Sequence, residues 1–215
     1  MNGFYRLILK LYNGIYPNKF YGNTKFPEGG AIILCNHFRA LDPAVIAELY
    51  PTDIYFLAKN ELFHNKLFSK ILYSLGAFPV DRDGGDVASL IKAVRIVKNG
   101  HKLVIFPEGT RNKTGTTNLQ PLKGGSGLIA AKTKAPIIPI MMINKSKIFH
   151  KNYVYVGDPF YLTDYYDKKL SSADISEMEE KIKEQMLLSY SKLLDLVPTK
   201  VKNKVLKKND SKKMQ

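Results

Sequence analysis

Residues 31–50 read AIILCNHFRALDPAVIAELY, and their pattern is the strongest indication of the fold class. Its first five residues form a continuous apolar run, which is typical of a strand that is buried on both faces of a parallel sheet. An Asp followed by a Pro then opens an apolar pattern at 42–50, and these two residues favour the start of a helix. A buried strand that leads directly into a helix is the repeating unit of an α/β domain.

The same alternation continues along the chain. Further strands are predicted at 54–58, 77–80, 102–106, 136–143 and 153–156, and helices at 63–75, 87–97, 128–133 and 174–197. The strand at 136–143 contains two prolines, so we expect it to be irregular or at the edge of the sheet. Asp86 is the expected cap of the helix at 87–97, and Asp174 with Glu177 is the expected capping box of the last helix. These patterns predict an α/β fold, a single domain with a largely parallel central sheet flanked by helices.

The composition is strongly basic. The 215 residues include 33 Lys or Arg against 19 Asp or Glu, a formal net charge of +14, and this balance indicates an anionic partner. The single cysteine, Cys35, excludes a disulfide framework and a Cys-rich zinc module. No nucleic-acid partner is expected, because Trp is absent and the densest basic run lies in the terminal segment 200–213.

Both ends of the chain suggest contact with a lipid surface. Residues 1–20 are expected to form an amphipathic interfacial segment, 21–197 the folded domain, and 198–215 a basic, flexible tail. The apolar residues of the first segment are spaced for one helical face and are Phe4, Leu7, Ile8, Leu11 and Ile15. This short helix either lies in a bilayer interface or docks on the domain. No run approaches the roughly 20 apolar residues of a spanning helix.

Four blocks of sequence follow strands of the predicted sheet, where sites form in α/β domains. The first, NHFRALD at 36–42, spaces His37 and Asp42 so that the carboxylate can return to the imidazole. Such a pair makes a general base for a substrate hydroxyl, although a structural histidine and a plain helix cap explain the spacing as well. The others are FPVDR at 78–82, FPEGTR at 106–111 and the rigid, apolar APIIPI at 135–140.

Taken in order, these blocks resemble the glycerolipid acyltransferase family, and within it the bacterial 1-acylglycerol-3-phosphate O-acyltransferases. The resemblance runs from about residue 29 to 140 and is carried by NHFRALD, GAFPVDR, FPEGTR and KAPIIPI, with AKNELF at 58–63 and LKGGSG at 122–127 as further similar text. The His-x4-Asp motif of the family corresponds to His37 and Asp42. One position departs from the pattern, because Arg39 stands where many members have a small polar residue.

The resemblance implies transfer of a fatty acyl group from a thioester to the sn-2 hydroxyl of lysophosphatidic acid, which makes phosphatidic acid in phospholipid biosynthesis. His37 would act as general base, oriented by Asp42. The substrate phosphate would be held by Arg82, Glu108, Gly109, Thr110 and Arg111, with Lys59 and Lys123 as weaker candidates. The donor would be acyl-coenzyme A or acyl-carrier protein, and no metal or cofactor is expected. The protein would lie peripherally on an anionic membrane surface, at the cytoplasmic face of the cell membrane.

Several alternatives stay open. Cys35 and His37 would face the same side of an extended strand, so a thiol nucleophile is a rival mechanism. The acceptor could instead be glycerol 3-phosphate or another lysolipid. A non-catalytic membrane-binding module would keep the fold but would not need the His37–Asp42 pair.

Overall fold

The computed structural model describes residues 3–25, 27–50, 52–80, 87–112, 119–122, 125–143 and 147–211. These residues contain a seven-stranded sheet in the order β1-β7-β6-β2-β5-β3-β4. Its strands are β1 (Asn18–Gly22), β2 (Ala31–Cys35), β3 (Ile54–Lys59), β4 (Ala77–Val80), β5 (Lys102–Ile105), β6 (Ile137–Met142) and β7 (Asn152–Val156). The α-helices are α1 (Gly3–Ile15), α2 (Asp42–Leu49), α3 (Lys66–Ser74), α4 (Val87–Lys98), α5 (Gly125–Thr133), α6 (Ser172–Leu196) and α7 (Thr199–Ser211), with short 3-10 helices η1 (Asn60–Phe63) and η2 (Thr163–Tyr165).

Most of the sheet is parallel, which confirms the predicted fold class. Five adjacent strands are parallel to one another, in the order β6, β2, β5, β3 and β4. β7 runs antiparallel to β6, and β1 runs parallel to β7. The carboxyl ends of the five parallel strands therefore meet at one edge of the sheet, which we call the carboxyl edge. The loops that follow β2, β5 and β6 start there.

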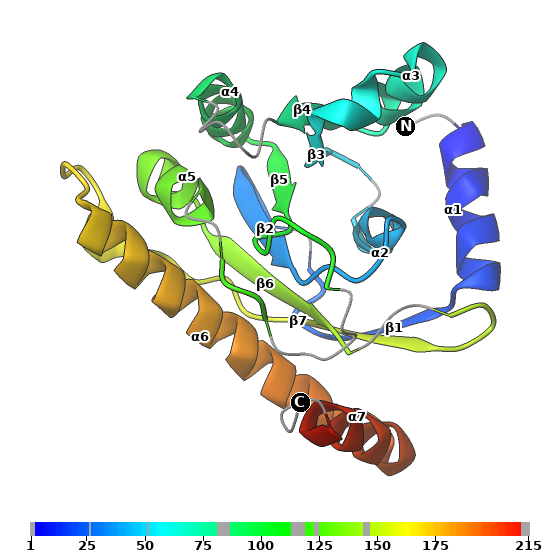
Figure 1. Ribbon diagram of the computed structural model, residues 1–215. Helices are drawn as coiled ribbons and strands as arrows, with labels where there is room; N and C mark the ends of the chain where they lie inside the picture. Colours follow the sequence, from blue (N-terminus) through cyan, green and yellow to red (C-terminus); the bar gives the residue numbers. More distant parts are fainter. Residues whose placement is uncertain are drawn as a thin grey trace.

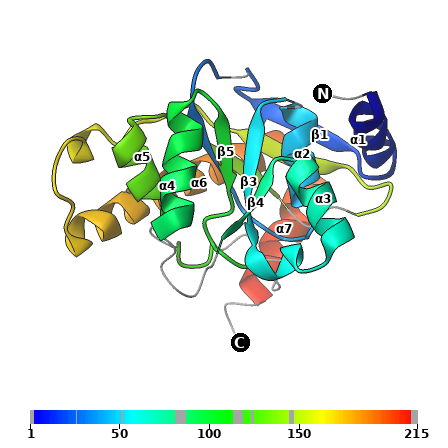
Figure 2. The same ribbon diagram turned by 90° about the horizontal axis from the view of Figure 1, so that it is seen from above.

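Helices cover both faces of the sheet. Figures 1 and 2 show α1, α2 and α3 on one side and α4, α5 and α6 on the other. β2 is completely buried between them, and its side chains alternate between two cores. Ile32 and Leu34 pack into the core beneath α4, α5 and α6, while Ile33 and Cys35 pack into the core beneath α1 and α2. Burial on both faces explains the continuous apolar run of this strand.

The expectation of an edge position for the strand at 136–143 was wrong. β6 is fully buried between β2 and β7, although Pro139 lies within it. The carbonyl oxygen of Pro139 accepts a hydrogen bond from the backbone N–H of Gly157, one residue beyond the end of β7. Since the N and C=O of a strand residue point to the same side, the missing N–H of Pro139 faces the end of β7. The ladder with β2 is therefore not interrupted.

Smaller differences concern the ends of helices and one strand. β1 was not predicted, and the predicted helix 63–75 is shorter in the structure, where α3 begins at Lys66 after the separate 3-10 helix η1. α6 is capped by a capping box of Ser171 and Asp174 instead of Asp174 and Glu177. Asp174 is thus the residue inside the first turn that bonds back to the cap, and Ser171 is the cap itself. Asp86 lies outside the described residues.

The first and the last elements of the described chain are both helices. The segment expected as a flexible tail forms α7, because Val201 and Val205 of its apolar side pack on the core beneath α6. At the other end, α1 contacts α2 and buries Leu9. Leu11 and Ile15 on the same helix are 60% and 41% exposed. α1 is therefore docked on the domain by one side and leaves apolar side chains on another.

Candidate active site at the carboxyl edge

His37 and Asp42 meet at the end of β2. The Nδ1 atom of His37 lies 2.9 Å from Oδ2 of Asp42. The same carboxylate oxygen accepts hydrogen bonds from the backbone N–H groups of Phe38 and Arg39, at 2.6 and 2.7 Å. Asp42 is 1% exposed and is the first residue of α2, where Leu41 and not Asp42 occupies the cap position. The simple helix-cap interpretation of Asp42 was therefore wrong: the carboxylate closes the His37 loop.

This geometry fixes the tautomer of His37. Because Oδ2 of Asp42 is an acceptor, the proton of a neutral imidazole lies on Nδ1 and the lone pair on Nε2. The His37 side chain is 13% exposed, so the ring is held in the protein but reaches its surface. An oriented imidazole with its basic nitrogen directed away from the carboxylate is the arrangement that general-base chemistry requires.

Residues after β5 hold the other sides of His37. The ring of Phe106 stacks on the imidazole with centroids 4.2 Å apart. The backbone N–H of His37 donates to Oε1 of Glu108 at 3.0 Å, and the carbonyl of His37 accepts from the N–H of Asn112 at 2.7 Å. The motif at 106–111 therefore fixes both the backbone and the ring of the histidine in the motif at 36–42.

Glu108 has a different position from the expected one. Its second oxygen accepts a hydrogen bond from the backbone N–H of Gln120 at 3.2 Å, and the residue is 3% exposed. Burial raises the pKa of this carboxyl above its ordinary value, against the lowering effect of the two backbone bonds. Both carboxylate oxygens of Glu108 accept hydrogen bonds from backbone N–H groups. A carboxylate would also repel the negative charge of a phosphate. The expected contact of Glu108 with the substrate phosphate does not fit this geometry.

Asn36 is a positioning residue that the sequence analysis did not single out. Its side-chain amide donates to the carbonyl of Met142 at 2.9 Å and accepts from the N–H of Met142 at 2.8 Å. This pair of bonds extends the β2–β6 ladder by one step through a side chain, directly before His37. A buried polar residue after an apolar strand was the available signal, because such a residue needs hydrogen-bond partners.

Cys35 does not provide a nucleophile. It is fully buried in the core beneath α1 and α2, and burial, with the nearby Asp42 and Glu108 carboxylates, raises the pKa of its thiol well above the ordinary value. Only a thiolate is an effective nucleophile. The thiol mechanism is therefore not supported by the geometry.

The other residues predicted to bind the substrate phosphate lie in the loop after β5, at the end of β3, or outside the described residues. Thr110 and Arg111 are exposed in the loop after β5, where Gly109 adopts a φ of 67° and allows the turn, and Thr110 donates to the side chain of Gln120 at 3.0 Å. Lys59 ends β3 and forms an ion pair with Glu61 at 2.6 Å. Arg82 and Lys123 lie outside the described residues. Thr110 and Arg111 follow β5 and Lys59 is the last residue of β3, so all three lie at the carboxyl edge with His37.

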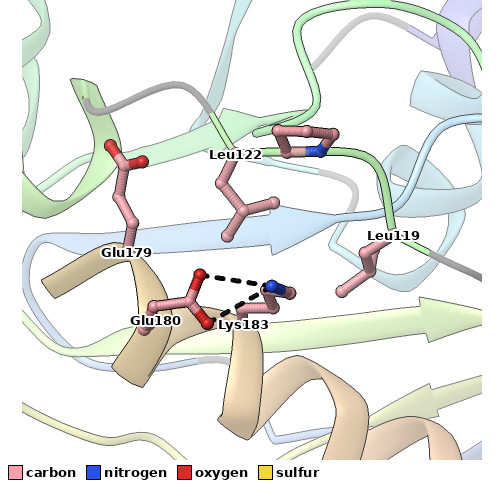
Figure 3. A pocket seen from close by; sticks show the side chains of 6 residues that line it. Leu119, Leu122, Glu179, Glu180 and Lys183 are labelled. Carbon is pink, nitrogen blue, oxygen red and sulfur yellow. Dashed lines mark hydrogen bonds and ion pairs between the residues drawn. The ribbon is translucent and has the colours of Figure 1, made fainter. Parts of the chain in front are cut away.

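A hollow of about 290 Å³ lies between the 119–122 segment and α6 (Figure 3). Leu119, Pro121 and Leu122 line one side, and Glu179, Glu180 and Lys183 of α6 line the other. Lys183 lies 3.2 Å from both oxygens of Glu180, and the two leucines pack on the core beneath α6. The hollow thus belongs to the opposite face of the sheet from Cys35, and its carboxylates do not suit an anionic substrate.

Within the described ranges, no three His, Cys, Asp or Glu side chains gather in a way that would hold a metal ion. None of the helices in this part of the chain combines the length and apolarity that a membrane crossing requires.

The fold and the His37 site define an α/β protein in which an aspartate-oriented histidine lies at the carboxyl edge of the sheet, and among the described residues the neighbouring Cys35 thiol is buried. Comparison with known proteins identifies the family. The acyltransferase family model matches residues 18–143, and the chain belongs to this family.

Individual relatives agree with this assignment. The 1-acyl-sn-glycerol-3-phosphate acyltransferase of Bacillus subtilis is 31% identical over 189 residues, which cover 83% of this chain and 92% of the relative. The protein of the same name from Helicobacter pylori is 37% identical over 127 residues, covering 58% of this chain and 53% of that relative. The crystal structure of the 1-acyl-sn-glycerophosphate acyltransferase PlsC from Thermotoga maritima matches with a TM-score of 0.64 at 20% identity, over 91% of this chain and 83% of that one.

Proposed function

We propose that this protein transfers a fatty acyl group from an acyl thioester to the sn-2 hydroxyl of lysophosphatidic acid and so makes phosphatidic acid. The observation that carries the proposal is the His37–Asp42 pair, in which a buried carboxylate holds Nδ1 and leaves Nε2 for a substrate hydroxyl. The relatives in Bacillus subtilis and Helicobacter pylori are named for this activity.

In the proposed reaction, Nε2 of His37 takes the proton of the acceptor hydroxyl as its oxygen attacks the thioester carbonyl. The new C–O bond forms, the C–S bond breaks, and the imidazolium returns its proton to the departing thiolate. General-base help of this kind contributes roughly 10²–10⁴ in rate. The thioester is already activated, so the step needs no acyl-enzyme.

The other residues would position the reactants. Glu108 and Asn112 hold the backbone of His37, and Phe106 holds its ring. We assign the acceptor phosphate to Arg111 and Arg82, whose planar guanidinium groups match phosphate oxygens, with Lys59 and Lys123 as further cations. Thr110 and the backbone of Gly109 would line the same position. The donor is acyl-coenzyme A or acyl-carrier protein.

A lysolipid acceptor would have to leave a bilayer, which supports a peripheral position on an anionic membrane, at its cytoplasmic face. The net charge of +14 and the exposed apolar residues of α1 favour such a contact.

The test is a transfer assay with a labelled acyl thioester and either lysophosphatidic acid or glycerol 3-phosphate, run beside His37→Ala. We expect phosphatidic acid from the wild type, and its loss in a variant that keeps the thermal stability of the wild type. Transfer only to glycerol 3-phosphate would replace the proposed acceptor. Unchanged transfer by the variant would remove His37 from the mechanism, and no transfer to either acceptor would contradict the proposed activity.

A further inference from the structure

The connection between β6 and β7 contains a well-defined turn at residues 147–150, which we call the 147–150 turn. Lys147 and His150 form an isolated antiparallel bridge, and the backbone N–H of His150 donates to the carbonyl of Lys147 at 3.1 Å. Nδ1 of His150 donates to the carbonyl of Ile148 at 2.8 Å. The backbone N–H of Phe149 donates to the carbonyl of Ile15 at 2.7 Å. The turn is thus closed internally and tied to the last residue of α1.

Phe149 is an unusual residue for this place. Its φ of 54° lies in the left-handed region that favours Gly or Asn, so a bulky side chain is strained there. The side chain is nevertheless 76% exposed, and the adjacent Ile148 is 55% exposed. Phe149 therefore costs backbone strain without contributing to the core. Folding of this chain gives no reason for an aromatic residue at this position.

The turn lies at the carboxyl edge of the sheet, as the candidate active site does. β6 runs parallel to β2, with Ile140 opposite Cys35, so the chain leaves β6 at the edge where His37 follows β2. Figure 1 shows the β6–β7 connection reaching beyond the sheet beside the C-terminal end of α1. Other exposed apolar residues gather at this edge: Ile15 at the end of α1 is 41% exposed, and Leu41 before α2 is 49% exposed.

The charge around the turn selects an anionic partner. Lys147, His150 and Lys151 are all exposed and flank the two apolar side chains. The β6–β7 connection at 143–151 contains three Lys and no Asp or Glu. Exposed apolar side chains flanked by lysines fit a membrane interface, where the apolar groups enter the acyl boundary and the ammonium groups meet lipid phosphates.

We propose that the 147–150 turn inserts into an anionic bilayer, with Ile148 and Phe149 entering the interface and Lys147 and Lys151 contacting phosphate headgroups. The hydrogen bond between Phe149 and Ile15 makes the turn and α1 one contact surface. The inference deepens the proposed function, because it would bring the carboxyl edge onto the surface that holds the lysolipid.

The absence of Trp from the chain makes a direct test simple. Phe149→Trp places the single tryptophan of the variant at the turn, where it can be excited selectively over the tyrosines, and the matched control is Tyr161→Trp. Tyr161 is 56% exposed and follows the bridge of Phe160 to Ile137, at the start of β6 and so at the opposite edge of the sheet. Each variant is mixed with vesicles of phosphatidylcholine alone or with phosphatidylglycerol added.

We expect a blue shift of the emission from position 149 with phosphatidylglycerol vesicles, a weaker one with phosphatidylcholine alone, and none from position 161. An unchanged emission at position 149 would overturn the proposal. A blue shift that grows with protein concentration without vesicles would also overturn it, in favour of contact with a second copy of this chain.

A second variant separates membrane contact from folding and from catalysis. Phe149→Gly relieves the left-handed strain, so its melting temperature should equal or exceed that of the wild type. Its vesicle affinity should fall roughly tenfold or more, as expected for loss of one buried aromatic side chain, and Phe149→Leu should recover part of it.

Transfer to a short-chain, water-soluble lysophosphatidate should be unchanged by Phe149→Gly, whereas transfer to a long-chain acceptor in vesicles should fall. If neither acceptor is acylated by the wild type, the proposed function fails while the fluorescence result still decides the membrane contact. If vesicle affinity is unchanged in Phe149→Gly while the short-chain acceptor is acylated, the turn proposal fails and the function stands.

Discussion

In the described part of the chain, two His–Asp pairs lie at opposite edges of the sheet. At the carboxyl edge, His37 and Asp42 are 13% and 1% exposed, and two backbone N–H groups fix the carboxylate. At the opposite edge, Nδ1 of His101 contacts Oδ1 of Asp53 where β5 and β3 begin, and these side chains are 36% and 38% exposed. In both pairs a histidine Nδ1 atom contacts an aspartate carboxylate oxygen, but the surroundings of the two contacts differ.

The difference lies in what holds each partner. His37 is clamped by Phe106, Glu108 and Asn112, whereas the ring of His101 is tilted against Tyr55 with centroids 5.1 Å apart, and Asp53 is also 3.5 Å from Lys102. An exposed pair is screened by water and contributes little. A His–Asp contact therefore indicates a base only when burial and further bonds keep it in one geometry.

The largest contrast should appear in the carboxylates. In Asp42→Asn, the single amide oxygen has to replace a carboxylate. If the NH2 group faces His37, the imidazole loses the acceptor for Nδ1–H and the two backbone N–H groups lose theirs, so kcat should fall roughly 10²–10⁴-fold. Asp53→Asn is the matched control, because Asn tolerates the φ of 61° at this position. Steady-state transfer assays measure kcat for both variants. Equal losses of kcat would show that burial of the His37–Asp42 pair gives it no special role in catalysis.

The clamp on His37 should give the next largest effect. Glu108→Gln leaves one acceptor oxygen, whereas the backbone N–H groups of His37 and Gln120 each need one. The backbone of His37 is therefore held less firmly. We expect kcat to fall roughly 10–100-fold with little change in KM. A rise in KM for the acceptor with kcat intact would instead assign Glu108 to acceptor binding, as the sequence first indicated.

The same substitution has a pH dependence. Burial raises the folded-state pKa of Glu108, so its favourable contribution is present below its unfolded pKa of about 4.5 and is lost as pH rises through the folded value. The stability of the wild type relative to Glu108→Gln should therefore decrease as pH rises above that unfolded pKa, by at most about 1.4 kcal/mol per pH unit. Urea denaturation across this range measures the trend, and the opposite slope would show that the backbone bonds outweigh burial.

A smaller effect is expected for the buried thiol. Cys35→Ala removes one sulfur from the core and should cost about 1 kcal/mol of unfolding free energy. The transfer rate should not change, because the raised pKa of Cys35 keeps it a thiol. Loss of activity in the folded variant would return the thiol mechanism to consideration.

The smallest effect is expected at the second pair. His101→Gln should change the unfolding free energy by no more than about 0.5 kcal/mol, since the pair is more than one third exposed. Transfer activity should equal that of the wild type. A clear loss of activity would show that the opposite edge of the sheet, where His101 lies, takes part in the reaction.

Much of the fold could be predicted because its signals are local. The apolar run at 31–35, the run at 102–106 and the helical patterns between them depend only on which faces each element buries. The errors came where the partner of an element mattered. β6 was expected at an edge because Pro139 lacks an N–H, and only the position of β7 made an interior place acceptable. The tail was expected to be flexible, but α6 provides a surface for Val205.

For the site, the amino-acid order alone places His37 and Asp42 five positions apart and the FPEGTR motif after a later strand. The support of His37 by Glu108, 71 residues away, and the bonds of Asn36 to Met142 arise from the packing of the strands. The physical reason is that the spacing of His37 and Asp42 is set within one loop. The contacts of Glu108 and Asn36 exist only once β2 lies between β5 and β6, and the sequence alone does not fix that order.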